Sequence, residues 1–192
     1  RVDADAMITE TARLMDALPH ALPRPRVTVI GALGRVGRGA AAACAALDLP
    51  VTGWDMQETA QGGPFPEILS HDIFLNCILA GPQTPVFVPK TALTAPRSLS
   101  VIGDIACDPD SDYNPVPVYD RATTWAAPAL RVHDDPLMDV MAIDNLPSML
   151  PLESSQDFAG QLLPTLSQLD GDQDGVWARA RATFATHMAA LG

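Results

Sequence analysis

The stretch Val27-Thr28-Val29-Ile30-Gly31-Ala32-Leu33-Gly34-Arg35-Val36-Gly37, followed by Trp54-Asp55, decides the fold class of this chain. A β-branched run leads into three glycines spaced three residues apart, and an alanine-rich run follows at 36–47. Glycines let a backbone turn sharply and approach a pyrophosphate, and the start of a helix offers unpaired N–H groups. A second apolar run ends at Asp55, where an acid can accept hydrogen bonds from a ribose. This order of elements predicts a dinucleotide-binding fold.

Asp55 also bears on the choice of cofactor. A carboxylate at this position accepts the free ribose diol of NAD and repels the 2′-phosphate of NADP. Arg35 and Arg38 are counter-evidence, because a guanidinium can pair with the pyrophosphate or with a 2′-phosphate. The balance favours NAD. The alternative for the glycine loop is an ordinary strand–helix turn that binds no ligand.

Charge and composition exclude several classes of protein. The 192 residues carry 12 Lys and Arg against 23 Asp and Glu, a formal net charge of −11, which disfavours binding to nucleic acid or to an anionic membrane. No apolar run reaches the roughly 20 residues that span a bilayer. The three cysteines, Cys44, Cys77 and Cys107, are widely spaced, which favours buried, reduced thiols and a cytoplasmic location.

Hydrophobic periodicity predicts an α/β protein. Strands are expected at 27–30, 50–54, 72–79, 99–105 and 129–132, and helices at 3–18, 36–47, 153–169 and 174–190, with weaker helical patterns at 86–93 and 119–125. The continuous apolar run at 73–79 is typical of a parallel strand covered on both faces. The expected fold is a Rossmann-like, doubly wound parallel sheet with an N-terminal connector helix and C-terminal helices.

Three regions are expected along the chain. Residues 1–22 form a connector helix from an upstream domain, residues 23–150 form the NAD-binding domain, and residues 151–192 form helices that pack toward that upstream domain. The first residue is Arg1 rather than Met, which we interpret as a sign that the sequence is part of a longer polypeptide.

Two acidic segments resemble metal-binding loops in part, but neither has the full set of residues that such a loop requires. Residues 170–175 match the front half of a calcium loop, but Arg181 stands where a bidentate glutamate is required. Helix capping by Asp172 or Asp174 explains this segment better. Residues 108–114 alternate acids without a turn glycine or a closing acid, and are expected to form a solvated loop after the 99–105 strand. No metal site is predicted.

No catalytic residue is predicted in this chain. The histidines, His20, His71, His133 and His187, show no spacing suited to metal ligation or to a triad, and there is no G-x-S-x-G motif. The one lysine, Lys90, is expected to be a surface cation.

Several further segments are more specific than a glycine loop. They are Glu58-Thr59, Gly62-Gly63-Pro64-Phe65, residues 72–78, residues 114–119 and Ile143-Asp144-Asn145-Leu146-Pro147-Ser148-Met149-Leu150-Pro151. With these segments, residues 27 to about 187 resemble the NAD-dependent, lysine-forming saccharopine dehydrogenases. The resemblance implies a two-domain enzyme with its active site between the domains. It also implies hydride transfer from saccharopine to NAD, followed by hydrolysis of the imine to lysine and 2-oxoglutarate.

The resemblance assigns roles to residues of this chain. It places Gly34 and Arg35 on the pyrophosphate within the Gly31 to Gly37 loop, and Asp55 on the adenosine ribose. Thr59, Leu79 and Ile105 would line the cofactor cleft, and Ile143, Asp144, Asn145 and Leu146 would approach the nicotinamide. The family's acid–base lysine and histidine lie on the preceding domain, and Lys90 does not match that lysine. This chain alone is therefore expected to bind dinucleotide without turnover.

Asn145 stands where a histidine is common in the family, which leaves the substrate open. One alternative is a related NAD-dependent dehydrogenase of another amino-acid conjugate or of a polyamine precursor. The other is a non-catalytic NAD-binding or regulatory module.

Overall fold

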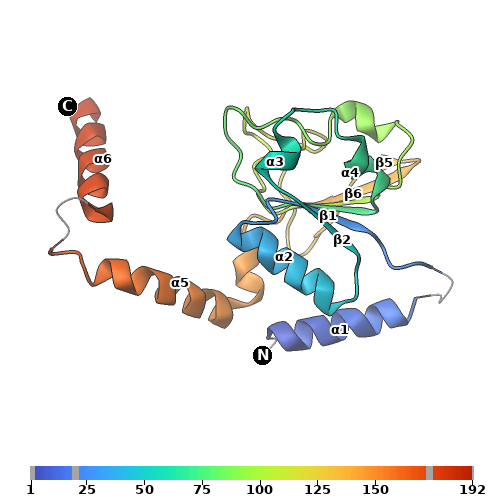
Figure 1. The fold of residues 1–192 in the computed structure, drawn as a ribbon, viewed down its shortest axis with the longest axis horizontal. Coiled ribbons are helices and arrows are strands. Elements are labelled where there is room, and N and C mark those ends of the chain that lie inside the picture. The colour runs from blue at the N-terminus through green and yellow to red at the C-terminus, as the bar shows by residue number, and fades with distance from the viewer. Residues whose placement is uncertain (1–2, 19–21, 172–174, 192) are drawn as a thin grey trace. The chain divides into compact units, whose positions relative to one another are not determined.

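The computed structural model describes residues 3–18, 22–171 and 175–191 (Figure 1). The chain divides into two compact units, Val2–Leu146 and Pro147–Gly192. The first unit contains the sheet and the glycine loop. The predicted caps Asp172 and Asp174, and also His20, lie outside the described residues.

The first unit is built on a six-stranded sheet with the order β2-β1-β3-β4-β6-β5. The strands are β1 (Val27–Ile30), β2 (Val51–Trp54), β3 (Ile73–Asn76), β4 (Val101–Asp104), β5 (Leu130–Asp134) and β6 (Leu137–Met141). All neighbouring pairs are parallel except β5 with β6. Ile30 pairs with both Trp54 and Asn76, and Asn76 pairs with Asp104, so four strands end level at one edge. The predicted doubly wound α/β fold is confirmed.

Alternation along the strands divides the core into two layers. On one face, Val27 and Val29 pack with Cys44 of α2 (Arg35–Ala46). On the other face, Ile30 and Phe74 pack with Ile68 of α4 (Pro66–Ser70). Figure 1 shows α2 and α4 on opposite sides of the sheet. Successive residues along a strand thus point to opposite faces of the sheet, and helices cover both faces, as a buried parallel sheet requires.

Two weak helical predictions are wrong. Of residues 86–93, only Lys90–Leu93 form a 3₁₀ turn, because the N–H groups of Phe87 and Val88 both donate to the Pro115 carbonyl. Residues 119–125 are not helical. Thr123 instead pairs with Ile143, and the Thr123 N–H donates to the Ala142 carbonyl at 2.8 Å. This pairing keeps the segment around the β-branched Thr123 extended.

The last strands also differ from the expectation. The strand predicted at 129–132 is β5, and it lies antiparallel at the sheet edge because a tight connection after Asp134 returns the chain as β6. The sequence analysis missed β6. Two short helices after β2 were also not predicted, namely α3 (Met56–Thr59) and α4.

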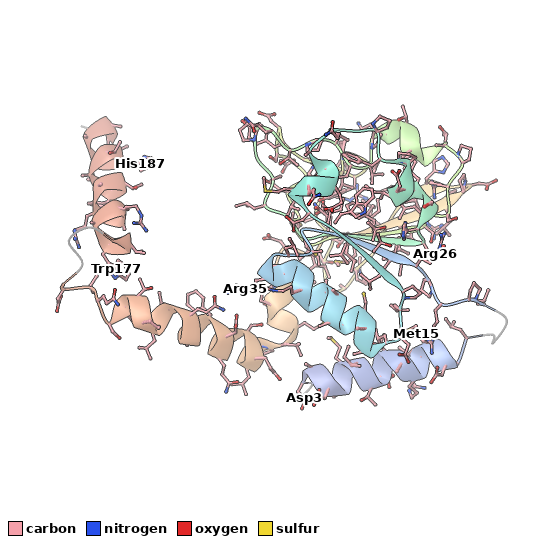
Figure 2. All side chains as sticks on the ribbon, in the orientation of Figure 1. Asp3, Met15, Arg26, Arg35, Trp177 and His187 are labelled. Atoms are coloured by element: carbon pink, nitrogen blue, oxygen red, sulfur yellow. The ribbon has the colours of Figure 1, made fainter. Side chains whose placement is uncertain are left out.

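The remaining helices match the predicted ones closely. They are α1 (Ala4–Asp16), α5 (Pro151–Leu166) and α6 (Val176–Leu191), and a 3₁₀ turn at Leu146–Met149 precedes α5. Trp177 of α6, labelled in Figure 2, donates its indole N–H to the Thr165 carbonyl at 2.7 Å. None of these three helices buries a residue. In the described part of the chain, none of the helices has the length and apolar character that crossing a bilayer requires.

Candidate functional site

The three glycines of the loop are held by close backbone contacts. Gly31 has a φ of +86°, and a Cβ there would lie 2.8 Å from the Cys77 carbonyl oxygen. A Cβ on Gly37 would lie 2.0 Å from the Gly31 carbonyl oxygen, far inside van der Waals contact. The loop therefore turns in a left-handed conformation that favours glycine and packs α2 directly against it.

The start of α2 carries no side-chain cap. Gly34 is its N-cap residue, in extended conformation. The first N–H groups of a helix need partners from outside, and the helix dipole favours a negative one. Figure 2 shows Arg35 at this end of α2, where its side chain is exposed. Unpaired backbone donors beside a glycine loop are the usual elements of a phosphate-binding helix start.

Asp55 is tied to the same loop. Its Oδ2 accepts the Leu33 N–H at 2.9 Å, and its Oδ1 accepts the Met56 N–H at 2.9 Å. It is also the N-cap of α3 in a capping box with Glu58. The carboxylate is therefore fixed beside the glycine loop rather than free in solvent.

A cavity of about 610 Å³ opens at this edge of the sheet. Its walls come from the ends of β1 and from the segments after β2 and β3, and they include the predicted residues Asp55, Thr59 and Leu79. Leu79 is 98% exposed and Met56, also in the wall, is 81% exposed. A wall of apolar side chains with a few polar groups is typical of a small-molecule pocket.

The other predicted cofactor residues follow β4 and β6. Ile105 comes directly after β4 and donates its N–H to the Asn76 carbonyl at 3.0 Å. Ile143 is buried, and Asp144 and Asn145 form an exposed turn that leads into Leu146. The Asn145 Oδ1 accepts the Trp125 indole N–H at 3.1 Å. These residues lie at the carboxyl ends of their strands, but none of them lines the 610 Å³ cavity.

A second cavity of about 70 Å³ shares Ile78 and Leu79 with the first. It extends past Asp104 and Ala106 to Asn114. The hollow at the carboxyl edge thus runs from the segment after β2 toward the segment after β4. A ligand that crosses between β1 and β3 would follow this direction, as in other open α/β sheets.

The sequence analysis missed a buried polar cluster below this edge. Asp104 accepts hydrogen bonds from the Asn76 amide at 2.9 Å, from the Tyr119 hydroxyl at 2.7 Å and from the Cys107 N–H at 3.3 Å. Burial and the Asp104 carboxylate raise the pKa of Tyr119 far above its usual value. The available signal was a polar residue at the end of each apolar strand, Asn76 at the end of β3 and Asp104 at the end of β4.

Several thiol and imidazole groups of the first unit are buried or hydrogen-bonded. Burial raises the pKa of Cys77 to about 11 and also raises that of Cys107. His71 is engaged by Thr52 and by the Glu67 carbonyl, and His133 contacts the Pro136 carbonyl. Among the described residues, no cluster of His, Cys, Asp or Glu could hold a metal ion.

Comparison with known proteins supports the resemblance. No family model matches the chain. The saccharopine dehydrogenase [NAD(+), L-lysine-forming] of Neurospora crassa is 42% identical over 97% of this chain and 53% of its own length. The proteins of the same name from Yarrowia lipolytica and Candida albicans are 45% and 43% identical over 88% and 87% of this chain, and 47% and 46% of their own lengths. The chain spans about half the length of these curated relatives.

Proposed function

We propose that this chain, a relative of the NAD-dependent, lysine-forming saccharopine dehydrogenases over most of its length, is the dinucleotide-binding part of such an oxidoreductase. The reaction proposed for the whole protein is oxidation of the C–NH group of saccharopine, giving lysine and 2-oxoglutarate. One observation carries the proposal: Asp55, which is hydrogen-bonded to the Leu33 N–H of the glycine loop, lines the 610 Å³ cavity at the carboxyl edge of a doubly wound sheet. This is where such sheets bind nucleotides.

Each predicted residue has a proposed place along the cofactor. Gly31, Gly34, Arg35 and Gly37 would face the pyrophosphate, Asp55 the adenosine ribose, Thr59 and Leu79 the adenosine side of the cleft, and Ile105, Ile143, Asp144, Asn145 and Leu146 the nicotinamide side. When bound, NAD would supply the hydride acceptor. The contribution of this chain is to bind and orient the cofactor against the sheet edge.

NAD is proposed over NADP because of Asp55. Its carboxylate accepts three backbone N–H groups and is held beside the loop, so it cannot readily swing away from a 2′-phosphate. A fixed negative charge favours a ribose diol and disfavours a phosphate.

The groups that move protons are proposed to lie on an upstream domain. Hydrolysis of an imine needs an acid or base that titrates near neutrality, whereas burial raises the pKa of Cys77, which follows β3, to about 11. The proposed organisation is a connector at 1–22, the NAD-binding domain at 23–150 and C-terminal helices at 151–192 that pack toward the upstream domain. Support comes from exposed apolar side chains on α5 and α6, such as Phe158 at 65% and Phe184 at 68%.

A cytoplasmic location belongs to the same proposal, supported by three free cysteines.

One observation favours a second candidate, a dehydrogenase of a different amino-acid conjugate. Asn145 stands where a histidine is common, and its side chain is engaged by Trp125. A changed side chain on the nicotinamide side would alter substrate contacts while leaving the adenosine half intact.

Calorimetric titration of this chain with NAD and NADP tests the cofactor proposal. We expect NAD to bind at least tenfold more tightly, the factor that about 1.4 kcal/mol of repulsion would give. Asp55→Ala should weaken NAD and narrow the difference from NADP. The matched control is Asp3→Ala, which removes the N-cap of α1 and should change neither affinity. Tighter binding of NADP by the unaltered chain would refute the choice of NAD.

A further inference from the structure

Glu58 forms a reciprocal pair with Asp55 at the start of α3. The Glu58 Oε2 accepts the Asp55 N–H at 2.7 Å, and the Asp55 carboxylate accepts the Glu58 N–H in return. Glu58 is exposed and does not line the 610 Å³ cavity. Any effect of Glu58 on a ligand must therefore act through Asp55 or through its own charge.

Most of the hydrogen-bonding capacity of Asp55 is already used. A carboxylate has about four lone-pair positions, and backbone N–H groups of Leu33, Met56 and Glu58 occupy three of them. The Asp55 side chain is thus fixed in orientation, with room for about one further donor such as a ribose hydroxyl. Glu58 fixes the same residue from its backbone side by holding the Asp55 N–H.

The two carboxylates place two negative charges at the proposed ribose end. Neither forms an ion pair within the described part of the chain. Two unit charges a few ångströms apart in water alter an affinity by about fivefold. A 2′-phosphate carries at least about 1.5 charges at neutral pH. Each carboxylate should therefore lower the affinity for a ligand with a 2′-phosphate by roughly tenfold.

We propose that Glu58 is a second specificity-determining residue, which positions Asp55 and adds a charge of its own against a 2′-phosphate. This inference rests on the proposed function, namely that the cavity holds the adenosine half of NAD. It has a direct consequence for the exclusion of NADP. Neutralising Asp55 alone should leave about tenfold of a hundredfold discrimination against the 2′-phosphate. Both carboxylates must be neutralised before a 2′-phosphate binds without penalty.

The test uses two small probes that differ only in the phosphate of interest, 5′-AMP and adenosine 2′,5′-bisphosphate. Dissociation constants are measured by calorimetry at low salt for the unaltered chain, Asp55→Asn, Glu58→Gln and the double variant. We expect the ratio of the bisphosphate constant to the 5′-AMP constant to fall about tenfold in each single variant and about a hundredfold in the double. Added salt should reduce the ratio in the unaltered chain, because exposed charges are screened.

Two controls separate charge from positioning. Glu58→Gln keeps an oxygen that can accept the Asp55 N–H, whereas Glu58→Ala removes both the charge and the acceptor. We expect Glu58→Gln to retain the affinity for 5′-AMP and Glu58→Ala to weaken it. Glu67→Gln neutralises an exposed acid in the first turn of α4 and should leave the ratio unchanged.

The outcomes that overturn the inference are distinct from those that overturn the proposed function. If Glu58→Gln leaves the ratio unchanged, or if Asp55→Asn alone removes all exclusion, Glu58 has no role in specificity. If the unaltered chain binds neither NAD nor 5′-AMP, the proposed function fails and the inference fails with it.

Discussion

Gly37 is where a single methyl group decides whether α2 can reach the glycine loop. A Cβ there would lie 2.0 Å from the Gly31 carbonyl oxygen, so Gly37→Ala must push the helix away from β1. We expect a loss of about 3 kcal/mol or more in the free energy of unfolding, as for other overpacked sites, together with loss of NAD binding. Urea unfolding and calorimetric titration measure the two effects.

Gly39 of the same helix is the matched control for this substitution. A Cβ there meets nothing within 4 Å, and Gly39→Ala should stabilise the chain by up to about 1 kcal/mol through helix propensity. Equal effects of the two substitutions would show that close packing at Gly37 does not matter.

The Cys77 thiol gives a pH dependence whose sign follows from burial. Burial raises its pKa to about 11, whereas a thiol in an unfolded chain has a pKa of about 8.5. Below pH 8.5 both states hold the proton and this group has no effect. Between about pH 8.5 and 11 the unfolded chain loses the proton first, so the free energy of unfolding falls as pH rises.

Cys77→Ala should therefore lose less stability than the unaltered chain between pH 8 and pH 10.5. Urea unfolding at the two pH values gives the comparison. Burial also raises the pKa of Cys44 and Tyr119, but both groups are present in both proteins, so the difference reports Cys77 alone. A parallel loss in the two proteins would contradict the assigned shift.

At the scale of elements, Arg97 joins three segments of the chain through their backbone carbonyls. Its guanidinium donates to the carbonyls of Ala92 and Leu93 in the 3₁₀ turn, to that of Leu99 before β4, and to those of Pro136 and Leu137 at the β5–β6 connection. Partial burial lowers the pKa of Arg97. The planar donor set of arginine fits this arrangement, and lysine cannot reproduce it.

Both Arg97→Ala and Arg97→Lys should therefore lower the free energy of unfolding by about 2 kcal/mol. The control is Arg121→Ala, because Arg121 is exposed and pairs with its neighbour Asp120 at the surface. Its loss should cost under about 0.5 kcal/mol. Thermal or urea unfolding measures all three. Full stability of Arg97→Lys would mean that a single cation, rather than the five-carbonyl arrangement, holds these segments.

The same scale shows what sequence could and could not predict about the fold. Helix α2 and strands β1 to β4 were predicted because their apolar residues repeat with the period of their own element. The helix expected at 119–125 was wrong because Thr123 pairs with Ile143, twenty residues later, and nothing near Thr123 in the sequence signals that partner. Strand β6 was missed for a similar reason, since its pairing depends on the turn after Asp134.

At the scale of the whole molecule, sequence again predicts local arrangements of the candidate site but not contacts between distant segments. The glycines and Asp55 could be predicted because they lie within one strand–helix–strand unit, where local spacing fixes geometry. The Asn76, Asp104 and Tyr119 cluster joins residues 15 and 28 positions apart and follows no repeat. Ile105 and Ile143 to Leu146 stay predictions, as do the other site residues, and none of these five lines the 610 Å³ cavity.

The last prediction concerns the whole protein. If the acid–base groups lie upstream, this chain with NAD and saccharopine should produce no NADH absorbance, although it binds NAD. A fusion that places the N-terminal half of the Neurospora crassa relative before this chain should produce NADH, because on the proposed organisation that half carries the acid–base groups. The same fusion carrying Gly37→Ala should be inactive, which ties turnover to cofactor binding by this chain. Turnover by the unfused chain would show that a group within residues 1–192 performs the proton transfers.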